Sequence, residues 1–142
     1  MMAMVAESRL HIEPRGVAVR KVGPWLKEAT AVLAPDVAGP LLARAELAVH
    51  EACMNVIDHA NLPIASSLEL ELELTAEHLI VRVFDLGDPF DLAGVPIPNP
   101  QVLQPRGYGV KIIRALVTEL SYRRVGETNE LTLRFDMEKT ND

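Results

Sequence analysis

The stretch LAVHEACMNVIDHAN, residues 47–61, predicts both a core-packing helix and a candidate site. In a helix, Glu51, Asn55 and His59 share one face, because they are spaced four residues apart. The same helix, extended backward, carries an apolar stripe at alternating spacings of three and four: Leu42, Ala45, Val49, Ala52, Cys53, Val56 and Ala60. A polar helix face is often only solvated, so the remaining sequence has to decide whether these side chains form a site.

Composition describes a globular domain. The chain has 142 residues, of which 49% are hydrophobic and 24% charged, which is enough apolar sequence for one core. The net charge of −6 argues against a nucleic-acid partner, which requires a basic face. Neither a secretory signal nor an apolar run of membrane-spanning length is evident, so we expect a cytoplasmic protein without a membrane partner. The single cysteine, Cys53, excludes an internal disulfide and a cysteine-clustered zinc site, and we expect it to be a buried, inert thiol.

The first half of the chain predicts one strand and two helices. A weak strand is expected over residues 9–13, followed by a helix over 16–33 that Gly23-Pro24 interrupts. Residues 35–40 form the predicted connection, and the second helix covers 41–60. Asn61, Leu62 and Pro63 are expected to end it.

The second half predicts a sheet. SLELELELTA, residues 67–76, alternates leucine with glutamate, which is typical of a strand with one solvated face. LIVRVFD, residues 79–85, follows as a more central strand of a hairpin. A proline-rich loop over 86–105, a helix over 107–118 and a closing hairpin across Gly126 complete the chain. The predicted class is α+β, a two-layer single domain over 1–142 with its core over about 9–135: a mixed, mostly antiparallel sheet with helices on one face.

Two further motifs suit a nucleotide. The first is DLGDPF, residues 85–90. Asp85 ends a strand, where its carboxylate can accept a hydrogen bond from an exocyclic amine, and Gly87 permits the close approach of a flat ring. An ordinary Asp-x-Gly turn has the same pattern. The second is PRGYGV, residues 105–110. Its two glycines lie at the start of a predicted helix, where unpaired backbone amides can bind a phosphate, and Arg106 adds a positive charge that can bind the same anion. A glycine-rich hinge is the alternative interpretation. In this order, the three motifs indicate a nucleotide between the helix layer and the sheet.

These motifs resemble the N box and the two glycine boxes of the Bergerat-fold ATPases, the superfamily of gyrase-type topoisomerases, heat-shock chaperones and sensor histidine kinases. HEACMNVIDHA, DLGDPF and RGYGVKIIRALVTELSYRR carry the resemblance, which extends over about residues 9–135. The short length and the EAxxN…HA pattern are most similar to the anti-sigma-factor serine/threonine kinases of bacterial partner-switching systems.

The resemblance implies a role for each matching residue. Glu51 is the base that accepts the proton of the substrate hydroxyl, Asn55 coordinates Mg²⁺, and Asp85 bonds the adenine amine above Gly87. His59 is expected to position the helix end. The remaining positions of the implied nucleotide site are Asp58, Pro89, Phe90, Arg106, Gly107, Tyr108, Gly109 and Val110. The implied cofactors are ATP and Mg²⁺; the implied partners are a STAS-domain antagonist as substrate, a sigma factor or similar target, and a second copy of the chain.

Three other functions compete with the kinase. A sensor histidine kinase is expected to have a longer lid and a phosphoacceptor helix pair, which this sequence does not predict. A zinc peptidase needs a second histidine at Met54, so that hypothesis fails. A non-catalytic, nucleotide-sensing module that sequesters a regulator by contact stays open, and it differs from the kinase at Glu51, which a pure binder does not need.

Overall fold

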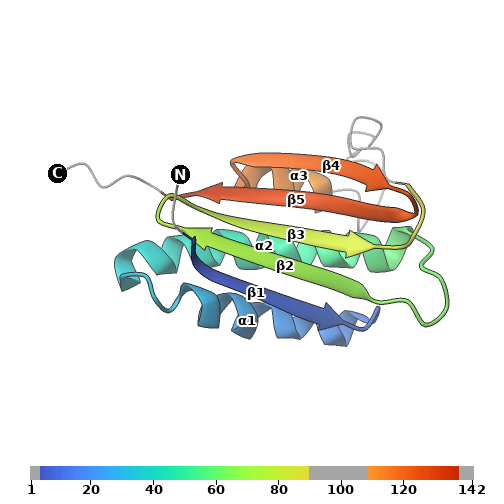
Figure 1. Cartoon of the computed structure of the whole chain (residues 1–142), viewed down its shortest axis with the longest axis horizontal. Coiled ribbons are helices and arrows are strands. Elements are labelled where there is room, and N and C mark those ends of the chain that lie inside the picture. Colours follow the sequence, from blue (N-terminus) through green and yellow to red (C-terminus); the bar gives the residue numbers. More distant parts are fainter. Residues whose placement is uncertain (1–3, 90–108, 138–142) are drawn as a thin grey trace, which may run out of the picture.

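A five-stranded antiparallel sheet forms one layer of the molecule, and the helices cover one of its faces (Figure 1). The computed structural model describes residues 4–89 and 109–137. The strands are β1 (Met4–Ile12), β2 (Leu68–Thr75), β3 (His78–Asp85), β4 (Glu119–Val125) and β5 (Thr128–Asp136), in the spatial order β1-β2-β3-β5-β4. The helices are the 3₁₀ helix η1 (Gly16–Lys21) and the α-helices α1 (Val22–Thr30), α2 (Pro35–His59) and α3 (Gly109–Leu116). The predicted α+β class with helices on one face is confirmed. The sheet was predicted to be mixed and mostly antiparallel, whereas every strand pairing among the described residues is antiparallel.

The alternation in β2 places its two kinds of side chain as predicted. Its leucines are fully buried under the helices: Leu68, Leu70, Leu72 and Leu74. Its glutamates face the other side, where Glu71 pairs with Arg9 of β1 (3.1 Å) and Glu73 with Arg82 of β3 (3.2 Å). These cross-strand pairs keep the uncovered face of the sheet polar.

The first strand is longer than the sequence pattern suggests. β1 begins at Met4, whereas alternation predicted a strand over 9–13 only. The added residues pair with β2 from Met4↔Thr75 to Ser8↔Leu72, so a neighbouring strand extends a segment whose own pattern is weak. The link between β2 and β3 comprises residues 76 and 77, whereas the predicted strands left residues 77 and 78 as the link.

The β4–β5 hairpin is confirmed. Val125 pairs with Thr128 across a two-residue turn, in which Gly126 has a φ of +62°. Glycine adopts this left-handed conformation without steric cost, and a positive φ at Gly126 followed by a negative φ at Glu127 is that of a type II′ turn.

Helix α2 begins earlier than the sequence predicted. The segment 35–40, predicted as a connection, forms its first turns, so α2 spans 25 residues. Pro35 lies at the helix start, where its missing N–H has no partner to lose. Pro40 lies inside the helix, and it is preceded by Gly39, which lacks the Cβ that would clash with the proline ring.

Two helices of different geometry occupy the segment that was predicted as one helix over 16–33. η1 ends at Lys21 and α1 begins at Val22, so Gly23 and Pro24 occupy the first turn of α1, where proline is tolerated. The predicted interruption is therefore a change from 3₁₀ to α geometry. α1 ends at Thr30, whose hydroxyl donates to the carbonyl of Leu26 (2.9 Å), three residues before the predicted end.

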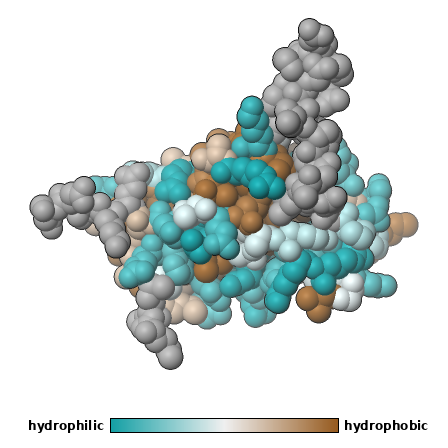
Figure 2. Space-filling model, turned by 90° about the horizontal axis from the view of Figure 1, so that it is seen from above, coloured by the Kyte–Doolittle hydropathy of each residue, from teal (hydrophilic) through white to brown (hydrophobic). Residues whose placement is uncertain are grey.

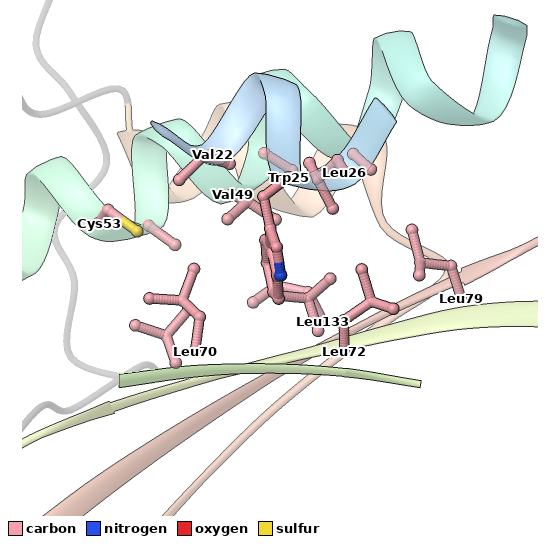
Figure 3. Close-up of a cluster of buried hydrophobic side chains, with 14 of the residues drawn as sticks. Val22, Trp25, Leu26, Val49, Cys53, Leu70, Leu72, Leu79 and Leu133 are labelled. Atoms are coloured by element: carbon pink, nitrogen blue, oxygen red, sulfur yellow. The ribbon is translucent and has the colours of Figure 1, made fainter. Parts of the chain in front are cut away.

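The core lies between α1, α2 and the inner face of the sheet (Figure 3). Trp25 of α1 reaches the sheet, and its indole N–H donates to Ser8 Oγ of β1 (2.8 Å), so its polar atom is satisfied. From the predicted α2 stripe, Ala45, Val49, Ala52 and Cys53 are buried, whereas Leu42, Val56 and Ala60 are half-buried.

Cys53 is a packing residue. Its side chain is fully buried among apolar neighbours, and burial raises the pKa of its thiol to about 12. Burial disfavours the thiolate, which is the nucleophilic form of cysteine. The expected burial of this cysteine is confirmed.

Arg44 of α2 holds the end of α3 against the sheet. Its Nε donates to the carbonyl of Leu116, the last residue of α3 (3.2 Å), and its Nη1 donates to the carbonyl of Asp136 in β5 (3.3 Å). The guanidinium also lies over the Phe135 ring, 5.9 Å from its centroid. α3 ends two residues before the predicted Thr118, because the amide of Thr118 donates to β5 (2.7 Å).

Among the described residues, no helix is long and apolar enough to cross a membrane.

Candidate functional site

A pocket lies between α2, α3, the end of β3 and the β4–β5 hairpin. More than half of its lining side chains are apolar, and a few polar groups converge on it, as in small-molecule sites. Its lining residues are Ala52, Asn55, Val56, His59, Ala60, Asp85, Asp88, Pro89, Val110, Ile113, Leu120, Tyr122, Asn129 and Leu131. Seen from above, an apolar area bordered by hydrophilic side chains lies on the side of the molecule where α3 and β4 are found (Figure 2).

Asp85 ends β3 inside this pocket and is only 6% exposed. Its Oδ1 accepts two hydrogen bonds, from the amide of Gly87 (2.8 Å) and from Nδ2 of Asn129 (2.9 Å). Within the described part of the chain, nothing donates to Oδ2. The carboxylate therefore retains one acceptor for a ligand at the pocket wall.

The turn after Asp85 is attached to the end of α2. The amide of Asp88 donates to the carbonyl of Ala60 (2.6 Å), and Nδ2 of Asn61 donates to Asp88 Oδ2 (2.8 Å). At Gly87, a Cβ would lie 2.4 Å from the Ala60 oxygen and 2.6 Å from the Ala60 Cβ. Glycine is needed here for contact with the helix end, a different reason from the predicted approach of a flat ring.

Replacing Gly87 by alanine should therefore destabilise the fold by about 1–3 kcal/mol, because the added Cβ overlaps backbone that cannot move independently. The matched control is Gly16→Ala, whose Cβ would meet only the Met54 methyl at 3.6 Å. Thermal or urea unfolding measures both variants. Equal stability of the two would contradict the close contact at Gly87.

Asn55 also lines the pocket and lies against the start of α3. A Cβ on Gly109 would lie 2.8 Å from Asn55 Oδ1 and 2.9 Å from Nδ2, so the glycine lets the helix start approach the amide. Asn55 is half-buried, and no residue of the described ranges hydrogen-bonds to its side chain. A neutral amide oxygen beside helix-start amides suits a hard cation with phosphate oxygens.

Glu51 precedes Asn55 by one turn of α2, about 6 Å along the helix axis. It is half-buried and lies outside the pocket lining. In the ranges 4–89 and 109–137, no hydrogen bond or ion pair engages its carboxylate, so the oxygens can accept a proton.

The other predicted site residues are distributed unevenly. His59, Pro89 and Val110 line the pocket, whereas Asp58 is exposed and does not. Phe90, Arg106, Gly107 and Tyr108 lie outside the described residues. Across 4–89 and 109–137, no cluster of three or more His, Cys, Asp or Glu side chains is placed to hold a metal ion.

Sequence reasoning missed two pocket residues, Asn129 and Tyr122, and a third residue that bonds to them from outside the lining, Arg124. The hydroxyl of Tyr122 (2.5 Å) and Nη1 of Arg124 (2.9 Å) both donate to Asn129 Oδ1. A signal was present, because all three share the strand alternation of the inward-facing residues of β4 and β5, which are otherwise leucine or phenylalanine. Polar residues at core-facing strand positions near a hairpin indicate a site.

The fold and this pocket define the class of protein. The family model of the histidine kinase-like ATPase domain matches residues 17–135, so the chain belongs to this family. This confirms the resemblance to Bergerat-fold ATPases that the three motifs predicted. No curated protein matches the chain in sequence.

Two solved structures share the fold. The crystal structure of the RsbU and RsbW domains of Rv1364c from Mycobacterium tuberculosis is 17% identical, with a TM-score of 0.70 over 96% of this chain and 34% of that one. The histidine kinase domain of the blue-light activated histidine kinase from Erythrobacter litoralis EL346 is 19% identical, with a TM-score of 0.53 over 84% of this chain and 59% of that one. The chain thus spans less than two thirds of either structure's length.

Proposed function

We propose that this protein is a Mg²⁺- and ATP-dependent serine/threonine protein kinase that phosphorylates a STAS-domain antagonist and otherwise sequesters a sigma factor or a similar regulator. The observation that carries the proposal is the placement of three groups. Asp85 and Asn55 line one pocket, Asn55 lies beside the start of α3, and the Glu51 carboxylate, which no described residue engages, lies one helical turn before Asn55.

The base of the nucleotide binds beside Asp85. Oδ2 of Asp85 accepts a hydrogen bond from the exocyclic amine of adenine, and the apolar walls formed by Val56, Val110 and Ile113 contact the ring. Pro89 and His59 border the same region from the turn and from the end of α2.

The triphosphate lies toward the start of α3. The amides of the Gly107–Gly109 segment and the charge of Arg106 bind phosphate oxygens, which is proposed from their sequence pattern alone. Asn55 fits a magnesium ion, because no described residue hydrogen-bonds to its amide and the absent Cβ of Gly109 lets the start of α3 approach it. Bound Mg²⁺ supplies neutralisation of phosphate charge.

Glu51 receives the proton of the attacking hydroxyl. Phosphoryl transfer depends mainly on positioning and charge neutralisation, so one carboxylate near the γ-phosphate is sufficient as the base. The half-buried side chain has no competing partner among the described residues, which leaves it available to a hydroxyl from another protein.

The partners are proposed from the N-box pattern and from the fold shared with an RsbW domain. Phosphorylation adds charge to the antagonist, which then releases the kinase, and the kinase is free to hold its target. A homodimer and a cytoplasmic location belong to the same proposal.

Incubation with γ-labelled ATP, Mg²⁺ and proteins encoded by neighbouring genes tests this function. We expect label on one small STAS-domain protein, in an acid-stable bond typical of phosphoserine or phosphothreonine. Nucleotide binding without any label transfer would instead favour the non-catalytic module, and absence of nucleotide binding would contradict both.

A further inference from the structure

The Asn129 side chain bonds to several groups at the wall of the pocket. It is 3% exposed and pairs directly with Asp85 across the β3–β5 ladder. Its Nδ2 lies 2.9 Å from Asp85 Oδ1 and 3.0 Å from the carbonyl oxygens of both Gly87 and Asp88. One amide therefore joins the last strand to the carboxylate and to the turn that follows it.

The orientation of this amide is determined by its neighbours. Arg124 can only donate hydrogen bonds, and its Nη1 lies 2.9 Å from Asn129 Oδ1 and 3.0 Å from the carbonyl of Gly87. The oxygen of Asn129 must therefore face Arg124, and the nitrogen must face Asp85. Tyr122 donates to the same oxygen (2.5 Å), which adds a second constraint.

This orientation determines which Asp85 oxygen is available. Asn129 and the Gly87 amide both occupy Oδ1, so the carboxylate cannot rotate without losing two hydrogen bonds. Oδ2 is left as an acceptor in a wall otherwise lined by apolar residues. A base with an amine at this place gains a hydrogen bond, whereas a base with a carbonyl oxygen meets a second acceptor.

We propose that Asn129 is the positioning residue for base selection: it acts through Asp85 to make the pocket prefer a purine that carries an exocyclic amine. The inference rests on the proposed function, in that it assumes a nucleotide base beside Asp85. It assigns to β5 a role in specificity that the three sequence motifs do not contain.

The test compares ADP with inosine diphosphate, which carries a carbonyl oxygen in place of the amine. The variant Asn129→Asp keeps the size of the side chain and the acceptor for Tyr122 and Arg124, but it replaces the donor to Asp85 by a carboxylate oxygen. Thr132→Ala, on the same strand but paired with Arg82 on the outer face, is the matched control. Calorimetry measures the affinity of each protein for both nucleotides.

We expect the wild type and T132A to bind ADP more tightly than inosine diphosphate. In N129D, the ratio of the two affinities should fall about tenfold, mostly through weaker ADP binding. Further, Asn129→Asp should have little additional effect on the ratio in an Asp85→Ala background, because it acts through that carboxylate.

Two results would overturn the inference in distinguishable ways. An unchanged ratio in N129D, or an equal loss of both affinities, would mean that Asn129 only supports the fold while the nucleotide site stands. A wild type that binds neither nucleotide would overturn the proposed function as well.

A measurement on the unaltered chain covers the case in which N129D does not fold. The side-chain amide signals of Asn129 in the nitrogen–proton NMR spectrum should shift more with ADP than with inosine diphosphate, because only ADP engages the other oxygen of Asp85. Equal shifts with the two nucleotides would contradict the role.

Discussion

Replacing Glu51 by glutamine should slow phosphoryl transfer by about 10²- to 10⁴-fold, the range expected when a general base is removed. Glutamine keeps the size of the side chain and cannot accept the proton at neutral pH. Because Glu51 lies outside the pocket lining, the affinity for ADP should not change. Single-turnover transfer of labelled phosphate measures the rate, and calorimetry measures the affinity.

The matched control is Glu46→Gln, which changes another carboxylate of α2 that is exposed and does not line the pocket. Its transfer rate should equal that of the wild type. Full activity of Glu51→Gln would refute Glu51 as the base. A parallel loss of activity and of ADP affinity would indicate that the variant disturbs the pocket rather than the proton transfer.

Replacing Asp85 by alanine should weaken ADP binding by about one to two orders of magnitude, because a charged hydrogen bond to the base is lost. Alanine also removes the acceptor for Gly87 and Asn129, so Asp85→Asn is the sharper variant. Asparagine can keep the Oδ1 contacts while it presents a donor to the base amine, and calorimetry should again show weak binding.

Asp136→Asn controls for the change from acid to amide, since Asp136 pairs with His78 at the opposite end of the β3–β5 ladder. It should bind ADP like the wild type. If Asp85→Asn also bound ADP normally while remaining folded by circular dichroism, the base would have to lie elsewhere, and the proposed orientation of the nucleotide would be wrong.

Strong local patterns were sufficient for most of the fold. The leucine–glutamate alternation of β2 and the long α2 stripe were confirmed because each segment buries one face regardless of its neighbours. The start of α2 was misplaced, because Pro35 and Pro40 normally indicate a break. The length of β1 was underestimated, because pairing with β2, rather than its own alternation, extends it to Met4.

For the candidate site, the sequence by itself was sufficient for the family and for the three motifs in their order along the chain. Each motif lies within one short segment, where helix or strand periodicity determines which residues share a face. Only the tertiary structure decided that Asn129 of β5 bonds to Asp85, that Tyr122 and Arg124 of β4 bond to Asn129, and that Gly87 is needed against Ala60. The contact of Asn129 with Asp85 joins residues 44 positions apart in the chain. Local periodicity carries no information about such contacts, since they arise only when strand register and helix packing bring the segments together.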